Sequence, residues 1–88
     1  MAKTIENLQA CVFELYSVGG PQDDEFAISK SQQVAADVRL KDVFEDSLDY
    51  LEYIMLVEDS FLIEITDDEA DTCKTFGDFL KVVNSRFS

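Results

Sequence analysis

The sequence predicts an all-α protein, a small four-helix bundle with a short third helix and a long loop between the first and second helices. Three observations support this class. Apolar residues recur at spacings of three and four in separate segments, residues that favour helix caps stand just before those segments, and the only alternating segment, residues 61–65, has no partner strand in view. With 88 residues, the chain is predicted to form one domain over residues 1–88, with a modest core.

The first helix is predicted to begin after Thr4, which can cap it, and to end near Ser17. Two glycines and a proline at residues 19–21 then interrupt the helical pattern. The apolar face of this helix consists of Ile5, Leu8, Val12 and Leu15, with Cys11 beside them.

The polar stretch from there to about Gln33 is predicted to be a loop, held to the core by Phe26 and Ile28. Residues 34–44 are ambiguous, because their valines suit either a short turn of helix or an extended connection. The whole segment 18–43 therefore has no assigned role.

The second helix is predicted to begin at Asp46 or Ser47 and to run to about Ser60. Either residue can cap it, and Asp46 with Asp49 forms an acidic variant of a capping box. At about 100° per residue, one face should enter the core: Leu51, Ile54, Val57 and Phe61.

The opposite face of this helix is acidic, with Asp49, Glu52 and Asp59 together. Leu56 within this face and Met55 at its border are both expected to be exposed. Glu58 points toward the core side, which is unusual for a carboxylate.

The third helix is predicted in the short acidic segment after Thr66, which can cap it. The acids of its first turn favour the positive end of the helix dipole. The last helix is predicted to start at Thr75 and to continue to about Arg86, with its apolar face formed by Phe76, Phe79, Leu80 and Val83.

Charge limits the possible partners. The chain has 19 acidic and 7 basic residues and a net charge of -12, and 12 of the acids lie between Lys41 and Lys74, where no base occurs. Such a surface repels phosphate backbones and anionic membranes, so we expect neither nucleic acid nor a membrane as partner. It suits partners with basic patches. The alternative is a solvated face that only keeps the protein soluble.

The residue inventory argues against an enzyme. Histidine is absent, which removes the usual general base and a common metal ligand, and we expect no metal site. Cys11 and Cys73 are too few for a disulfide framework and are expected to be buried free thiols. The N-terminus has no charged stretch followed by a long apolar run, and no later segment is apolar for long enough to cross a membrane. We therefore expect a cytoplasmic protein. We also expect it to be a monomer.

Ser47 has two possible roles. A serine at a helix start is usually a cap. Alternatively its hydroxyl carries a phosphate-containing group, because a helix N-terminus offers free N–H groups and a partial positive charge. Ser47 has no neighbouring base to activate it, so it would then be the substrate of another enzyme.

Residues 46–83, DSLDYLEYIMLVEDSFLIEITDDEADTCKTFGDFLKVV, resemble the acyl carrier protein family. The likeness comprises the Asp-Ser-Leu attachment motif, an acidic helix, an apolar loop, a short acidic helix and a final amphipathic helix. The opening KTIENL is also similar to the first helix of that family, although the loop that follows is longer. The resemblance implies a four-helix bundle of acyl-carrier type.

The resemblance implies that Ser47 receives 4′-phosphopantetheine from coenzyme A through a phosphopantetheinyl transferase. The thiol of this arm would carry acyl groups to enzymes of fatty-acid biosynthesis or acyl transfer. A polyketide or peptidyl carrier is the alternative within this class, and an acidic mimic of nucleic acid is the alternative outside it. The residues expected to bind partners are Asp46, Leu48, Asp49, Glu52, Met55, Leu56, Glu58 and Asp59.

The resemblance also implies that the core shelters an acyl chain. Phe44 stands where the family has glycine and is expected to alter the turn before Ser47. Thr66 replaces a frequent proline, and Cys73 replaces an aliphatic residue. The expected lining is Leu51, Ile54, Phe61, Ile63, Ile65, Cys73, Phe76 and Phe79.

Overall fold

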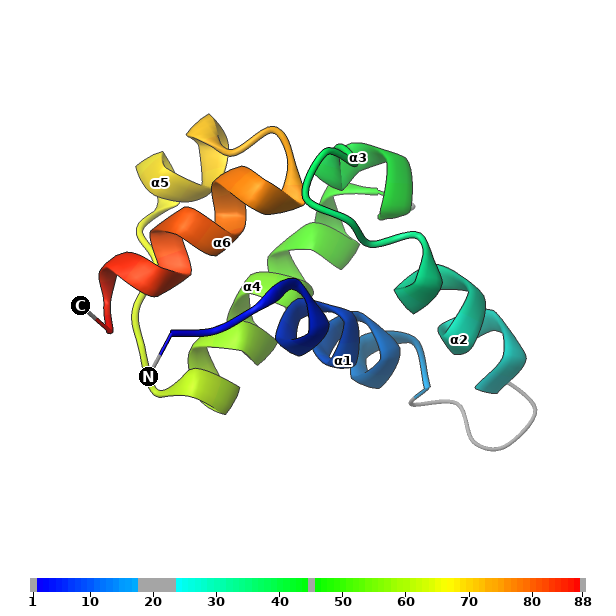
Figure 1. The fold of residues 1–88 in the computed structure, drawn as a ribbon. Coiled ribbons are helices and arrows are strands. Elements are labelled where there is room, and N and C mark those ends of the chain that lie inside the picture. The colour runs from blue at the N-terminus through cyan, green and yellow to red at the C-terminus, as the bar shows by residue number, and fades with distance from the viewer. Residues whose placement is uncertain (1, 18–23, 45, 88) are drawn as a thin grey trace.

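Helices make up the regular secondary structure of the residues that the structure describes. The computed structural model describes residues 2–17, 24–44 and 46–87, and in these ranges there are six α-helices and no β-strand (Figure 1). The all-α prediction is confirmed. In chain order the helices are α1 (Ile5–Tyr16), α2 (Asp24–Gln32), α3 (Leu40–Val43), α4 (Ser47–Phe61), α5 (Asp67–Thr72) and α6 (Phe76–Ser85).

The four predicted helices are α1, α4, α5 and α6. The first three begin after a residue predicted to cap them, whereas Thr75, predicted as the first residue of the last helix, is its N-cap. Thr4 is the N-cap of α1. In the other three helices the capping side chain accepts a hydrogen bond from the backbone N–H three residues on, which satisfies a donor that the helix itself cannot pair. These pairs are Asp46 with Asp49 (2.9 Å), Thr66 with Glu69 (3.1 Å) and Thr75 with Asp78 (3.1 Å).

Helix α2 corrects the prediction of a loop up to Gln33. Ala27 and Lys30 are its buried residues, so this helix has no apolar stripe that periodicity could reveal. Lys30 instead anchors it, because its ammonium donates a hydrogen bond to the Val43 carbonyl at 2.7 Å. A buried polar contact therefore takes the place of an apolar face in joining α2 to the end of α3.

Phe26 and Ile28 do not hold this segment to the core as predicted, since they are 47% and 43% exposed. Phe26 instead packs edge-on against Tyr16 of α1, with ring centroids 5.4 Å apart. The predicted interruption at residues 19–21 lies outside the described residues.

Both readings of residues 34–44 occur. Residues 40–43 form α3, residues 36–38 form a turn, and Arg39 is extended and makes a single antiparallel bridge with Thr75 at the start of α6. The Leu40 N–H donates to the Lys74 carbonyl (2.9 Å) and the Phe76 N–H donates to the Val38 carbonyl (3.0 Å). A Cβ on Gly77 would lie 2.8 Å from the Ala36 carbonyl oxygen, so this close approach requires glycine.

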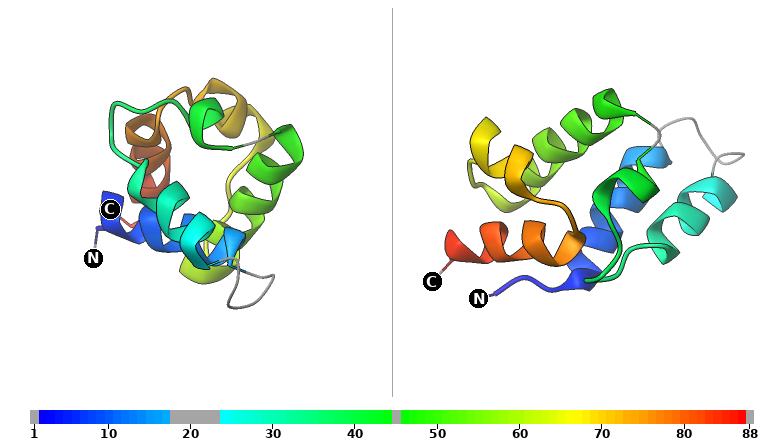
Figure 2. Two further views of the ribbon diagram at one scale, coloured as in Figure 1. Left: turned by 90° about the vertical axis from the view of Figure 1, so that its right-hand side faces the viewer. Right: turned by 90° about the horizontal axis from the view of Figure 1, so that it is seen from above.

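The helices surround one interior (Figure 2, left). Helix α1 packs against α2, α4 and α6 and so connects the two ends of the molecule. Figure 1 shows α2 and α3 at one end and α5 and α6 at the other. No helix in the described ranges has the length and apolar character needed to cross a membrane.

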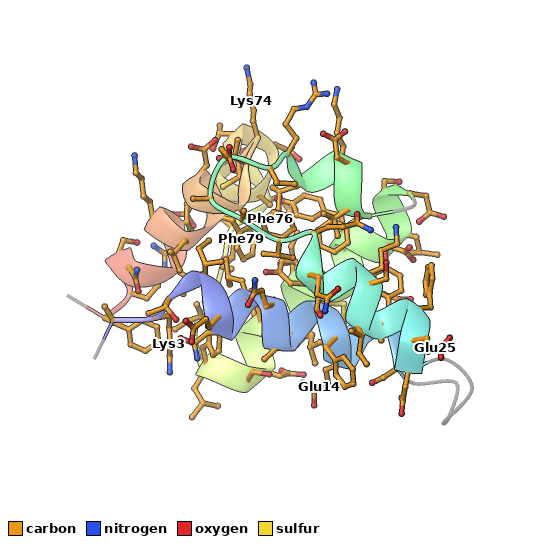
Figure 3. The ribbon with its side chains drawn as sticks, turned by 45° about the vertical axis from the view of Figure 1, so that its right-hand side comes forward. Lys3, Glu14, Glu25, Lys74, Phe76 and Phe79 are labelled. Carbon is orange, nitrogen blue, oxygen red and sulfur yellow. The ribbon has the colours of Figure 1, made fainter. Side chains whose placement is uncertain are left out.

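Five rings form the aromatic cluster at the centre of the core. Neighbouring ring centroids are 4.8 to 6.4 Å apart, a range in which tilted and edge-on pairs are favourable. Figure 3 shows two of these side chains, from α6, inside the molecule. The members are Phe44, Tyr50, Tyr53, Phe76 and Phe79.

The hydroxyl of Tyr53 is the unusual polar group of this core. It is buried and has no hydrogen-bond partner among the described residues. Burial raises the pKa of Tyr53 well above its ordinary value, so the hydroxyl keeps its proton. A buried hydroxyl without a partner lowers stability by its desolvation cost.

We expect Tyr53→Phe to raise the free energy of unfolding by about 1 kcal/mol, because it removes that unpaired hydroxyl. Urea denaturation would measure the change. Tyr50→Phe is the matched control, since the Tyr50 hydroxyl donates to the Ala70 carbonyl at 2.8 Å. The control should lose about 1 kcal/mol. Similar losses in the two variants would contradict the prediction.

Candidate functional site

Ser47 is the first residue of α4, and its side chain is exposed. Asp46, not Ser47, is the cap of this helix, because the Asp46 carboxylate accepts the Asp49 N–H. The Ser47 hydroxyl is therefore not needed to complete the helix end. It stands at the positive end of the dipole of a 15-residue helix, where a negatively charged group is stabilised.

Phe44 lies three residues before Ser47 and is part of the core. The backbone of Phe44 has φ -83° and ψ 134°, an extended conformation that needs no glycine. Its side chain is buried, with ring centroids 4.8 Å from Tyr53 and 5.8 Å from Phe76. Phe44 therefore belongs to the aromatic cluster, and its backbone does not require the glycine usual in the resembled family.

Two hollows adjoin Ser47. The first has a volume of about 610 Å³ and the second, next to α5, of about 430 Å³. Tyr50 lines both, and its hydroxyl bonds to Ala70 of α5. The first hollow is also lined by buried or half-buried Leu40, Phe44 and Cys73 and by exposed Arg39, Lys41, Asp46 and Lys74. The second is also lined by Leu48, Leu51, Ile54, Asp67, Ala70 and Asp71.

Exposed apolar and acidic side chains share one face of α4. Their spacing of three and four along the helix places them side by side. Leu48, Leu51 and Met55 are 60%, 49% and 57% exposed, which is a large exposure for apolar residues so close together. We call this group the α4 face; it consists of Leu48, Leu51, Glu52, Met55 and Asp59.

The prediction that Leu51 enters the core is wrong. Tyr53 is fully buried and Tyr50 half-buried, so the two tyrosines turn the core side of α4 away from Leu51. The predicted faces of this helix did not include Tyr50 or Tyr53. Their large apolar rings were the signal that could have corrected the prediction.

Three residues predicted to bind partners lie away from the α4 face. The half-buried Asp49 accepts a hydrogen bond from the Tyr16 hydroxyl at 3.0 Å. Leu56 is also half-buried and packs against the core, which corrects its predicted exposure. Glu58 accepts the Ile65 N–H at 2.8 Å, which explains why a carboxylate points toward the core side. These contacts hold α4 to its neighbours.

The residues predicted to line the interior, apart from Leu51, lie in or against the core. Both cysteines are free thiols; Cys11 is buried and Cys73 half-buried. Burial raises the pKa of Cys11 to about 11 and, together with Asp78 and Glu69, raises the pKa of Cys73. Both thiols therefore stay protonated at neutral pH. The buried members are Ile54, Ile65, Phe76 and Phe79, and the half-buried ones are Phe61, Ile63 and Cys73.

Comparison with known proteins yields clear relatives. The acyl carrier protein of Lactobacillus acidophilus is 37% identical over 62 residues, which cover 70% of this chain and 78% of that protein. The acyl carrier proteins of Chlamydia trachomatis serovars D and A are each 33% identical over 63 residues, covering 72% of this chain and 82% of theirs. No protein-family model matches the chain.

Proposed function

Because this chain belongs to the acyl carrier protein family, we propose that it carries acyl groups as thioesters on a 4′-phosphopantetheine arm attached to Ser47. The observation that carries the proposal is the position of Ser47. It is exposed, it begins α4 within an Asp-Ser-Leu motif, and two hollows adjoin it. We further propose that residues 1–88 act as one carrier domain.

The residues around Ser47 fit a phosphodiester. The first N–H groups of a helix have no partner within it, and the positive end of the dipole offsets part of the repulsion from this acidic chain. Since Asp46 already caps the helix, substitution on Ser47 leaves the cap bond in place. The thiol at the end of the bound arm supplies the thioester linkage to the acyl group.

Ser47 is the substrate in the attachment step. Its Oγ bonds to the phosphorus that bears pantetheine in coenzyme A, the bond from this phosphorus to the bridging oxygen breaks, and adenosine 3′,5′-bisphosphate leaves. The hydroxyl proton passes to a base of the phosphopantetheinyl transferase. Incubation with coenzyme A and such a transferase, followed by intact mass measurement, tests the attachment.

The α4 face is the proposed docking surface for the transferase and for enzymes of fatty-acid biosynthesis. Its exposed leucines and methionine offer apolar area that a partner can bury. Glu52 and Asp59, both exposed, attract basic residues and speed encounter. Asp46 is exposed beside Ser47 and adds to the same charge. Asp49, Leu56 and Glu58 support this surface through the contacts that position α4.

We expect the double substitution Leu48→Ala with Met55→Ala to lower the kcat/KM of a phosphopantetheinyl transferase for this protein by about tenfold, the effect of losing apolar anchors at an interface. The rate of arm transfer at low protein concentration measures it. Leu62→Ala is the control, because Leu62 is 90% exposed but lies outside the α4 face. If the control and the double variant lose activity equally, the α4 face is not the docking surface.

A further inference from the structure

Three of the seven basic residues gather at the first hollow, although the chain as a whole has a charge of -12. They come from two segments far apart in sequence, residues 39–41 and residue 74. The hydrogen bonds from Leu40 to Lys74 and from Phe76 to Val38 hold those segments together. Lys41 and Lys74 stand at the two ends of the long acidic stretch that contains no basic residue. These hydrogen bonds bring both lysines to one site beside Ser47.

Two of these bases are available to a ligand. Arg39 pairs with Asp42 at 3.2 Å. In the described part of the chain, Lys41 and Lys74 make no ion pair, and both are exposed. Figure 3 shows the Lys74 side chain extending from the end of the molecule into solvent, where it can turn toward an anion. An anion at the first hollow would therefore meet the two exposed ammonium groups of Lys41 and Lys74.

The aromatic cluster limits how deep a bound group can go. Leu40, Phe44 and Cys73 give the first hollow an apolar lining. Behind Phe44 lie Tyr53, Phe76 and Phe79, which are fully buried and line neither hollow at Ser47. A long aliphatic chain would have to separate these packed rings, and close-packed interiors resist such insertion. A short group that stays within the hollow keeps the core intact.

We propose that the first hollow receives the carried acyl group and that Lys41 and Lys74 favour acyl groups ending in a carboxylate. The class is a dicarboxylic acid joined to the arm through one of its two carboxyls. The apolar lining contacts its methylene groups, and the ammonium groups hold the free carboxylate at the mouth of the hollow. This inference rests on the proposed attachment of the arm to Ser47.

The test compares two acyl groups of equal length. A phosphopantetheinyl transferase loads Ser47 of the ¹⁵N-labelled protein from adipyl-coenzyme A or hexanoyl-coenzyme A, and intact mass verifies loading. An exposed ion pair shifts an equilibrium by roughly two- to fivefold, so the adipyl group should occupy the first hollow more than the hexanoyl group does. We therefore expect the amide chemical shifts of residues 39–41 and 73–75, measured against the unacylated form, to change about twofold more for adipyl. Sodium chloride at about 1 M should shrink the difference.

Variants show whether the two lysines are responsible. Lys41→Gln with Lys74→Gln should remove the adipyl excess, whereas Lys81→Gln, an exposed lysine of α6 that does not line the first hollow, should keep it. Equal shifts for adipyl and hexanoyl on the loaded wild type would overturn this inference alone. So would an excess that survives in the double variant. Failure to load Ser47 would overturn the carrier proposal and this inference with it.

Discussion

Ser47→Ala should abolish the mass gain of one phosphopantetheinyl group that the wild-type chain shows with coenzyme A and a phosphopantetheinyl transferase. Alanine removes the only atom of this side chain that can bond to phosphorus. The fold should persist, because Asp46 supplies the cap and alanine is a strong helix former. We expect the free energy of unfolding to change by less than about 0.5 kcal/mol.

Intact mass measures the modification, and thermal unfolding verifies that the variant is folded. Ser29→Ala is the matched control, since Ser29 is an exposed serine of another helix, α2; it should gain the full mass. A mass gain on Ser47→Ala would place the arm elsewhere. No gain on the wild type with several transferases would contradict the carrier function.

Phe76→Ala should lower the free energy of unfolding by about 3–5 kcal/mol. Phe76 is fully buried, and its ring contacts those of Phe44 and Tyr53 in the aromatic cluster. The substitution removes this buried area and leaves a cavity where the start of α6 meets the rest of the core. Domains are stable by only about 5–15 kcal/mol in total, so the loss is a large fraction of the stability.

Urea denaturation followed by circular dichroism measures this loss. Phe26→Ala is the matched control, because Phe26 is 47% exposed on α2 and should lose less than about 1 kcal/mol. If Phe76→Ala lost no more than Phe26→Ala, the aromatic cluster would not be the centre of the core.

The helices that could be predicted are those with signals in a short stretch of sequence. α1, α4, α5 and α6 each follow a capping residue. The cap and the helical spacing of apolar residues both depend on residues close together in the sequence. Helix α2 could not be predicted in this way. One of its two buried residues is a lysine bonded to a carbonyl 13 residues away, and no periodic pattern marks such a contact.

The candidate site was predictable in part for the same reason. Ser47 at the start of an acidic helix follows from the local pattern around Asp46, and the exposure of Met55 agrees with the prediction. The exposure of Leu51 depends on which side of α4 carries the buried tyrosine rings. Packing of these rings against Phe44 and α6 decides that side.

The sequence by itself determined the all-α class, the caps, the helix that Ser47 begins and the acidic character of the chain, because each depends on neighbours along the chain. Only the tertiary structure decided that Lys41 and Lys74 meet beside Ser47 and that five aromatic rings close the interior behind them. Those arrangements depend on backbone hydrogen bonds between residues 38–40 and 74–76 and on side-chain packing. Neither leaves a periodic trace in sequence.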